Sequence, residues 1–143
     1  MTAVINHLDT SDDLTVIGES MRPLLTNEMG SSIEIYDTTG RTDMGPPPHQ
    51  HDWDEIYVML EGELDVVIGD EAPRRLAPGA VAFVPGGTTH AYRIASDGTR
   101  FLTILSTGNG LSFFRQMDEE VSFPPDLGDV VRIATGHGIE FAG

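Results

Sequence analysis

The sequence predicts one all-β domain, an antiparallel sandwich or small barrel with a short helix near the C-terminus. Between residues 14 and 106, short apolar runs are separated by Gly, Pro and Asp, which is typical of many short strands. Several runs alternate apolar with polar residues, as strands with one buried face do. A helical period occurs only in the tail. At 143 residues the chain suits one hydrophobic core, so we expect a single domain over residues 1–143.

The individual strands are predicted from apolar runs bounded by turn residues. They include residues 14–17, 32–36, 56–60, 64–68, 80–84, 91–94 and 101–105. Glu61 and Gly62 separate two of these runs and predict a hairpin, because glycine adopts positive φ at little cost. Evenly spaced strands with Gly and Pro turns are typical of sandwiches and barrels.

The tail predicts helical structure. Residues 111–117 could form one or two helical turns. Residues 126–136 predict an amphipathic helix, since apolar residues recur there at positions i, i+3, i+4 and i+7. The predicted apolar stripe consists of Leu127, Val130, Val131 and Ala134. Two prolines precede this helix and glycines follow it, and we expect it to pack over the outside or the end of the barrel.

The charge balance excludes several classes of function. The net charge is −15, and all eight basic residues are arginines. Such a surface repels nucleic acids and anionic membranes, and the absence of lysine excludes Schiff-base chemistry. No cysteine is present, so any metal must be held by nitrogen and oxygen. The first residues contain neither a basic region nor a long apolar run, from which we expect no signal peptide and a cytoplasmic location.

Four candidate metal ligands fall in two short stretches: His49, His51, Glu55 and His90. His49 and His51 are two residues apart, so both rings point to one face of a strand. The prolines at 46–48 exclude a helix there. Alone, this stretch could also be a chance histidine pair in a proline-rich loop with a surface glutamate.

The second stretch strengthens the prediction of a metal site. Residues 79–90 indicate a turn, a strand and a tight Pro85-Gly86-Gly87 turn, with His90 leading the next strand. A barrel places such a position opposite the first histidine pair. Three imidazoles and a carboxylate suit one divalent transition metal ion, and the sequence does not choose among Fe, Mn, Ni, Co, Cu and Zn.

Both stretches resemble the two motifs of the cupin superfamily. The first motif, G-x5-H-x-H-x(3,4)-E-x6-G, is matched from His49 to Gly62, with Gly45 four residues before His49 where the family has six. The second, G-x5-P-x-G-x2-H-x3-N, is matched over residues 79–90, and Ile94 stands where asparagine is usual. The motif regions are therefore residues 45–62 and 79–94.

The resemblance implies a cupin barrel, the double-stranded β-helix or jelly roll, with the metal held inside by His49, His51, Glu55 and His90. The chain looks most like small single-domain cupins of the quercetinase-like group. Cupins commonly pair strand edges, which implies a homodimer. In similar proteins the glutamate can loosen from the metal and act as a base, which makes Glu55 the candidate catalytic residue.

Strand parity predicts an apolar pocket around the ligands. The candidate substrate-binding residues are Trp53, Tyr57, Met59, Phe83, Tyr92 and Ile94. Each of them could equally be an ordinary residue of the barrel core. An aromatic pocket with one Lewis acid fits a small oxygen-bearing organic substrate.

Three functions are compatible with these residues. The first is a quercetinase-like dioxygenase acting on an aromatic or enolisable substrate. The second is a non-oxidative metal-dependent cyclase, isomerase or lyase. The third is a non-catalytic small-molecule-binding protein. The fold alone does not separate them.

Overall fold

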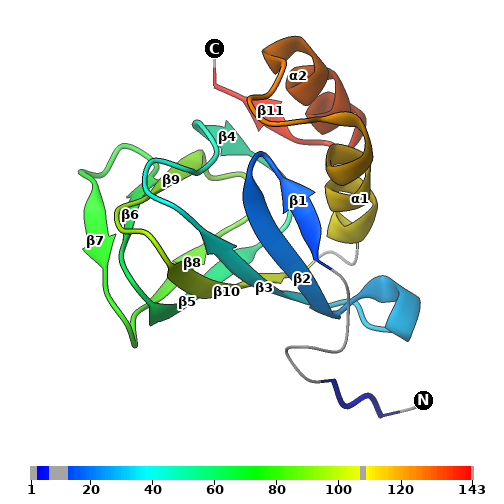
Figure 1. The fold of residues 1–143 in the computed structure, drawn as a ribbon, viewed down its shortest axis with the longest axis horizontal. Helices are drawn as coiled ribbons and strands as arrows, with labels where there is room; N and C mark the ends of the chain where they lie inside the picture. Colours follow the sequence, from blue (N-terminus) through cyan, green and yellow to red (C-terminus); the bar gives the residue numbers. More distant parts are fainter. Residues whose placement is uncertain (1–2, 7–12, 107–108, 143) are drawn as a thin grey trace.

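The structure is a computed structural model that describes residues 3–6, 13–106 and 109–142. Two antiparallel sheets form a barrel, with two helices beside one end (Figure 1). The first sheet contains, in spatial order, β1 (Leu14–Val16), β2 (Glu19–Leu25), β3 (Glu34–Gly40), β10 (Thr99–Leu105), β5 (Glu55–Glu61) and β8 (Val81–Val84). The second contains β11 (Glu140–Phe141), β4 (His49–Gln50), β9 (His90–Ile94), β6 (Leu64–Ile68) and β7 (Arg74–Leu76). A short 3-10 helix, Asn27–Met29, joins β2 to β3.

The core forms two groups of buried side chains, because alternate residues of each strand point into the barrel. In β10, every second residue from Thr99 to Leu105 is buried. One group fills the closed part of the barrel: Tyr57, Met59, Leu64, Val66, Ala82, Val84, Ile94 and Phe101. The other lies between the barrel and the helices: Val16, Met21, Tyr36, Leu105, Leu111, Met117, Val121, Val130 and Ile133.

The predicted strands are present. Three further strands were not predicted, and one connection differs from its prediction. β2, β7 and β11 have no clean apolar alternation, since β2 carries Glu19 and Pro23 and β7 begins with two arginines. The predicted hairpin at Glu61 and Gly62 is wrong. β5 pairs with β10 and β8, whereas β6 pairs with β9 and β7, so this turn carries the chain from one sheet to the other.

The first helix, α1 (Gly110–Glu120), is longer than the one or two turns predicted. Its start is fixed by Glu34 of β3, a fully buried carboxylate that accepts hydrogen bonds from the backbone N–H groups of Gly110 and Leu111 at 2.7 and 2.9 Å. Anionic groups stabilise helix N-termini because the first N–H groups have no partner within the helix. These two bonds hold the start of α1 against β3.

The second helix, α2 (Leu127–Gly136), lies where the period predicts it, and the Asp126 side chain caps it by accepting a hydrogen bond from the Asp129 N–H group. The predicted buried stripe is wrong in part. Leu127 and Val131 are 71% and 48% exposed, whereas Val130, Ile133 and Ala134 are buried. The helix is rotated so that Ile133 packs inward. Its contacts with α1 and β11 determine this orientation, which the sequence of the helix alone does not reveal.

Within the described residues, each helix is too short, or not apolar enough, to span a lipid bilayer.

Candidate metal centre

The four predicted ligands converge at one point inside the barrel. His49 of β4 lies directly across from His90 of β9 in the second sheet. Glu55 begins β5 in the first sheet, and His51 lies in the loop between β4 and β5. The four ligand atoms lie within 4.8 Å of one another, and all four residues are buried. Both sheets and the connecting loop therefore contribute to one cluster.

A tight turn fixes the loop that carries His51. The backbone N–H of Gly87 donates to the His51 carbonyl at 2.7 Å, and that of Gly86 donates to Asp54 Oδ1 at 2.8 Å. A Cβ atom at Gly86 would lie 2.1 Å from the Asp52 carbonyl oxygen, so only glycine fits there. Gly87 has a φ of +81°, which glycine adopts without strain. The positive φ of Gly87 accounts for the glycine that stands three residues before His90 in the second motif.

Each histidine ring is oriented by a backbone carbonyl. The Nδ1 atoms of His49, His51 and His90 lie 2.9, 3.0 and 2.9 Å from the carbonyl oxygens of Pro47, Trp53 and Thr88. Because a carbonyl oxygen only accepts hydrogen bonds, each Nδ1 carries the proton. In metal sites, such outer bonds fix the tautomer and the ring orientation. The Nε2 atoms are thereby left as the metal-binding atoms.

The carboxylate of Glu55 joins two of the rings. Its Oε2 atom lies 2.9 Å from His51 Nε2 and 3.1 Å from His90 Nε2. Burial opposes ionisation of Glu55, but the hydrogen bonds and charges of these two histidines outweigh it and lower the pKa to about 2. The ligand is therefore anionic at neutral pH, as a metal requires.

The pKa values of His49 and His90 shift in opposite directions. Burial, with the charge of His90, lowers the pKa of His49 to about 4. Burial also disfavours charge on His90, but its hydrogen bond and ion pair with Glu55 outweigh this and raise its pKa above the ordinary 6.5. His49 is therefore neutral and ready to bind metal, whereas His90 holds its proton more tightly than an ordinary histidine does.

Metal affinity is expected to fall as the pH falls through the raised pKa of His90. Below that pKa one proton must be displaced for each ion bound, so the dissociation constant should rise about tenfold per pH unit. Competition with a chelator of known affinity between pH 5 and 8 measures this slope. An affinity that does not change over that range would contradict the assignment of His90 as a ligand.

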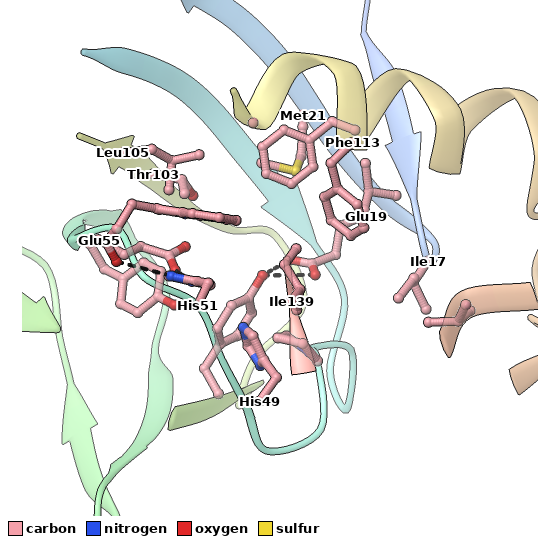
Figure 2. A pocket seen from close by; sticks show the side chains of 18 of the residues that line it. Ile17, Glu19, Met21, His49, His51, Glu55, Thr103, Leu105, Phe113 and Ile139 are labelled. Carbon is pink, nitrogen blue, oxygen red and sulfur yellow. Dashed lines mark hydrogen bonds and ion pairs between the residues drawn. The ribbon is translucent and has the colours of Figure 1, made fainter. Parts of the chain in front are cut away.

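A cavity of about 90 Å³ adjoins the cluster and is lined in part by residues of both helices, Phe113 and Phe114 of α1 and Val130 of α2 (Figure 2). Besides the metal ligands His49, His51 and Glu55, its lining is mostly apolar or aromatic: Val16, Ile17, Met21, Pro46, Trp53, Tyr57, Tyr92, Leu105, Phe113, Phe114, Val130, Ile139 and Phe141. Ile17 has a φ of +49°, a conformation that β-branched residues rarely adopt. Such strain at a cavity wall is common at functional sites.

The predicted pocket residues separate into three groups. Trp53, Tyr57 and Tyr92 line the cavity. Met59 and Ile94 are fully buried in the barrel core, away from the cavity lining. Phe83 was expected in the pocket and is instead 54% exposed, because alternation in β8 turns Ala82 and Val84 inward. Trp53 also stacks on His51, with ring centroids 4.3 Å apart.

Glu19 is a cavity residue that the sequence prediction missed. It is 5% exposed, and both of its oxygens lie 2.8 Å from the Tyr92 hydroxyl, which donates to it. Burial raises the pKa of Glu19 to about 8 against the effect of the Tyr92 hydrogen bond, with a further rise from the charge of Glu55. The sequence did offer one signal: Glu19 lies two residues before the buried Met21, so both side chains point to the same face of β2.

The hydroxyl of Tyr57 is the second notable group. Tyr57 is 1% exposed and lines the cavity, and within the described residues its oxygen is the buried side-chain polar atom that has no hydrogen-bond partner. A buried hydroxyl without a partner costs about 1–3 kcal/mol. Such a group beside a metal-binding cluster is a candidate contact for a bound small molecule.

Comparison with known proteins agrees with the motifs and the barrel. Residues 41–105 match the cupin domain family. Over 47 residues the chain is 47% identical to dimethylsulfoniopropionate lyase DddQ of Ruegeria pomeroyi, a match that covers 33% of this chain and only 23% of that protein.

Two solved structures are similar over most of the chain. KdgF from Halomonas sp. has a TM-score of 0.67 and 20% identity, and the match covers 74% of this chain and 94% of that one. The polyketide cyclase RemF from Streptomyces resistomycificus has a TM-score of 0.63 and 20% identity, covering 73% and 79%. At these identities the likeness shows the fold alone. The chain therefore has the cupin barrel fold, matches the cupin domain family over residues 41–105, and places His49, His51, Glu55 and His90 to bind a metal.

Proposed function

We propose that this protein is a metal-dependent enzyme that transfers a proton on a small oxygen-bearing molecule without using dioxygen, as a lyase or isomerase does. The observation that carries the proposal is the unpartnered Tyr57 hydroxyl in the cavity beside the metal-binding cluster. A substrate oxygen that accepts its hydrogen bond removes the cost of burying it. Groups that donate and accept protons therefore meet the substrate in one small space.

His49, His51, Glu55 and His90 would hold one divalent transition metal ion. When bound, such an ion is a Lewis acid that stabilises negative charge on a carbonyl, carboxylate or enolate oxygen. The carbonyl bonds at each Nδ1 keep the three rings aimed at the same point. The donor set fits this role, because three neutral imidazoles and one carboxylate are ordinary ligands of first-row metals.

Tyr57 and Glu55 have complementary roles in this proposal. Burial, followed by the charges of Glu55 and Glu19 and a weaker hydrogen-bond interaction with Glu55, raises the pKa of Tyr57. The hydroxyl therefore keeps its proton and is available to donate it in a hydrogen bond to a substrate oxygen. The Glu55 carboxylate is ionised and is the group that we propose accepts a proton from the substrate. Its Oε2 atom makes both histidine contacts, and Oε1 makes neither of them.

The size of the cavity favours a small substrate. Its volume of about 90 Å³ is well below the roughly 300 Å³ at which pockets for drug-sized ligands begin. A flavonol, with three rings, exceeds it. The partial match to a protein named as a lyase also supports non-oxidative chemistry, although it covers a third of this chain.

The quercetinase-like dioxygenase predicted from the sequence is the second candidate. It is favoured by the three-histidine, one-glutamate ligand set, which leaves positions for other ligands on a six-coordinate metal, and by the aromatic cavity wall. Dioxygen consumption that matches product formation would identify it. Ligand binding without product would instead identify the non-catalytic protein.

A Tyr57→Phe variant tests the proposal. Metal-loaded protein is incubated in D₂O under strict anaerobiosis with a panel of small carboxylates and ketones, and elimination or deuterium uptake is followed by NMR. We expect wild-type turnover without dioxygen and a loss of about 10²-fold or more in the variant, with metal content unchanged. Tyr36→Phe is the matched control, because Tyr36 is equally buried and is absent from the cavity lining. Turnover that requires dioxygen would contradict the proposal.

The homodimer and the cytoplasmic location stay predictions. β8 is an edge strand of the first sheet, and its outward Val81 and Phe83 are 63% and 54% exposed. An apolar strand edge of this kind agrees with pairing of two copies.

A further inference from the structure

The turn between β1 and β2 carries an isoleucine where such turns ordinarily have asparagine or glycine. Val16 pairs with Glu19, so the turn consists of two residues, Ile17 and Gly18. Both have positive φ, +49° and +82°, as the residues of a type I′ hairpin turn do. A β-branched side chain is disfavoured at positive φ. The backbone of the turn therefore does not account for Ile17, and the reason for it must lie in what its side chain contacts.

The Ile17 side chain lies between two cavities. It lines the inner cavity of about 90 Å³ beside the metal-binding cluster, and it also lines an outer cavity of about 500 Å³. Among the described residues that line these two cavities, Ile17 is the one that they share. Figure 2 shows Ile17 and Glu55 at opposite ends of the inner cavity, with Glu19 between them. Ile17 therefore closes the end of the inner cavity that faces away from the metal-binding cluster.

The outer cavity suits an apolar chain. Its lining includes the side chains of Met44 and Phe123 and extends to the exposed Arg41. A Cβ atom at Gly18 would lie 3.0 Å from Met44 Cε and from Phe123 Cδ2, so these two side chains pack tightly against the turn. This packing holds the backbone of the turn in place. The side chain of Ile17, rather than movement of the turn, therefore determines whether the two cavities are connected.

We propose that Ile17 is the specificity-determining residue that sets the maximum length of a ligand bound at the metal-binding cluster. A short ligand fits within the inner cavity. A longer chain that extends away from the cluster meets the Ile17 side chain and does not reach the outer cavity. Without this side chain, the two cavities would form one site that accepts long apolar chains. This inference rests on the proposed function, since it uses the bound metal as the anchor, but it does not depend on the reaction.

Two metal-binding ligands of different length test the proposal. Acetohydroxamate and octanohydroxamate carry the same chelating group and differ in the length of their alkyl chains. Their binding to cobalt-loaded protein is followed by the change in the visible absorption of Co(II), which reports contact with the metal itself. Wild-type protein should bind acetohydroxamate at least about tenfold more tightly, because a closed apolar pocket discriminates against even one extra methylene by about that factor.

The Ile17→Gly variant removes the side chain and suits the positive φ of the turn. We expect it to bind octanohydroxamate at least about tenfold more tightly than acetohydroxamate, since each buried methylene favours binding by about fourfold. Ile17→Leu keeps the volume of the side chain and should retain the wild-type preference. Ile33→Gly is the matched control, because Ile33 is 49% exposed and belongs to neither cavity lining.

The outcomes separate this inference from the proposed function. Equal or tighter binding of octanohydroxamate by the wild type overturns the inference. A wild-type preference retained in Ile17→Gly, with far-UV circular dichroism showing an intact fold, overturns it as well and leaves Ile17 with its packing against the core alone. If cobalt binds but neither hydroxamate does, the inference fails and the metal site stands. If cobalt does not bind, the proposed function fails and the length limit fails with it.

Discussion

Replacing His51 by alanine is expected to lower the bound transition metal from about one ion per chain to below about one tenth. The His51 side chain is 3% exposed, its Nε2 atom lies 2.9 Å from Glu55 Oε2, and its ring stacks on Trp53. Even outer residues of metal sites change affinity by about 10–100-fold, and loss of a direct ligand should cost at least about 100-fold. Mass spectrometry of protein purified without an affinity tag measures the metal content.

The control for this experiment is another histidine of the same chain. His137 follows α2 and hydrogen-bonds to Gln116 at 2.8 Å, outside the cluster. His137→Ala should keep the metal. Far-UV circular dichroism of both variants shows whether the barrel is intact. Full metal occupancy in a folded His51→Ala variant would show that the ion binds elsewhere.

Replacing Glu55 by glutamine is expected to reduce turnover of the substrate found with the panel by about 10³-fold, and to reduce metal content much less. General base catalysis contributes about 10²–10⁴-fold, and glutamine cannot accept the proton. The three histidines remain to hold the ion, each aimed by its own carbonyl bond. Turnover and metal content are measured on the same preparation.

Glu61→Gln is the matched control for Glu55→Gln. It lies at the far end of the same strand, β5, and is exposed to solvent. Equal losses of turnover and metal in Glu55→Gln would show that Glu55 acts as a ligand alone. A loss in Glu61→Gln would point instead to a general effect of charge.

The residues of the metal cluster were predictable because the two motifs combine ligands with turn residues. His49 and His51 have strand spacing, and the turn at residues 85–87 fixes where His90 returns to the sheet. The fold followed from the same pattern. These signals are local: each depends on residues close together in the sequence, so no knowledge of distant packing was needed.

The cavity wall was less predictable because it depends on packing between distant segments. Glu19 comes from a strand with a proline and no clean alternation, and only the closed barrel brings it beside Tyr92, 73 residues later. Phe83 was expected in the pocket, but the alternation of β8 turns Ala82 and Val84 inward and leaves Phe83 exposed. Likewise, the buried face of α2 is set by its contact with α1, which the stripe of Leu127 and Val131 does not reveal.

The account depends most directly on where the metal binds. Anomalous X-ray diffraction at the absorption edge of the bound metal, on crystals of metal-loaded protein, locates the ion without reference to activity. We predict a single strong peak among the Nε2 atoms of His49, His51 and His90 and the carboxylate of Glu55. A peak at surface carboxylates, with none inside this cluster, would contradict the account.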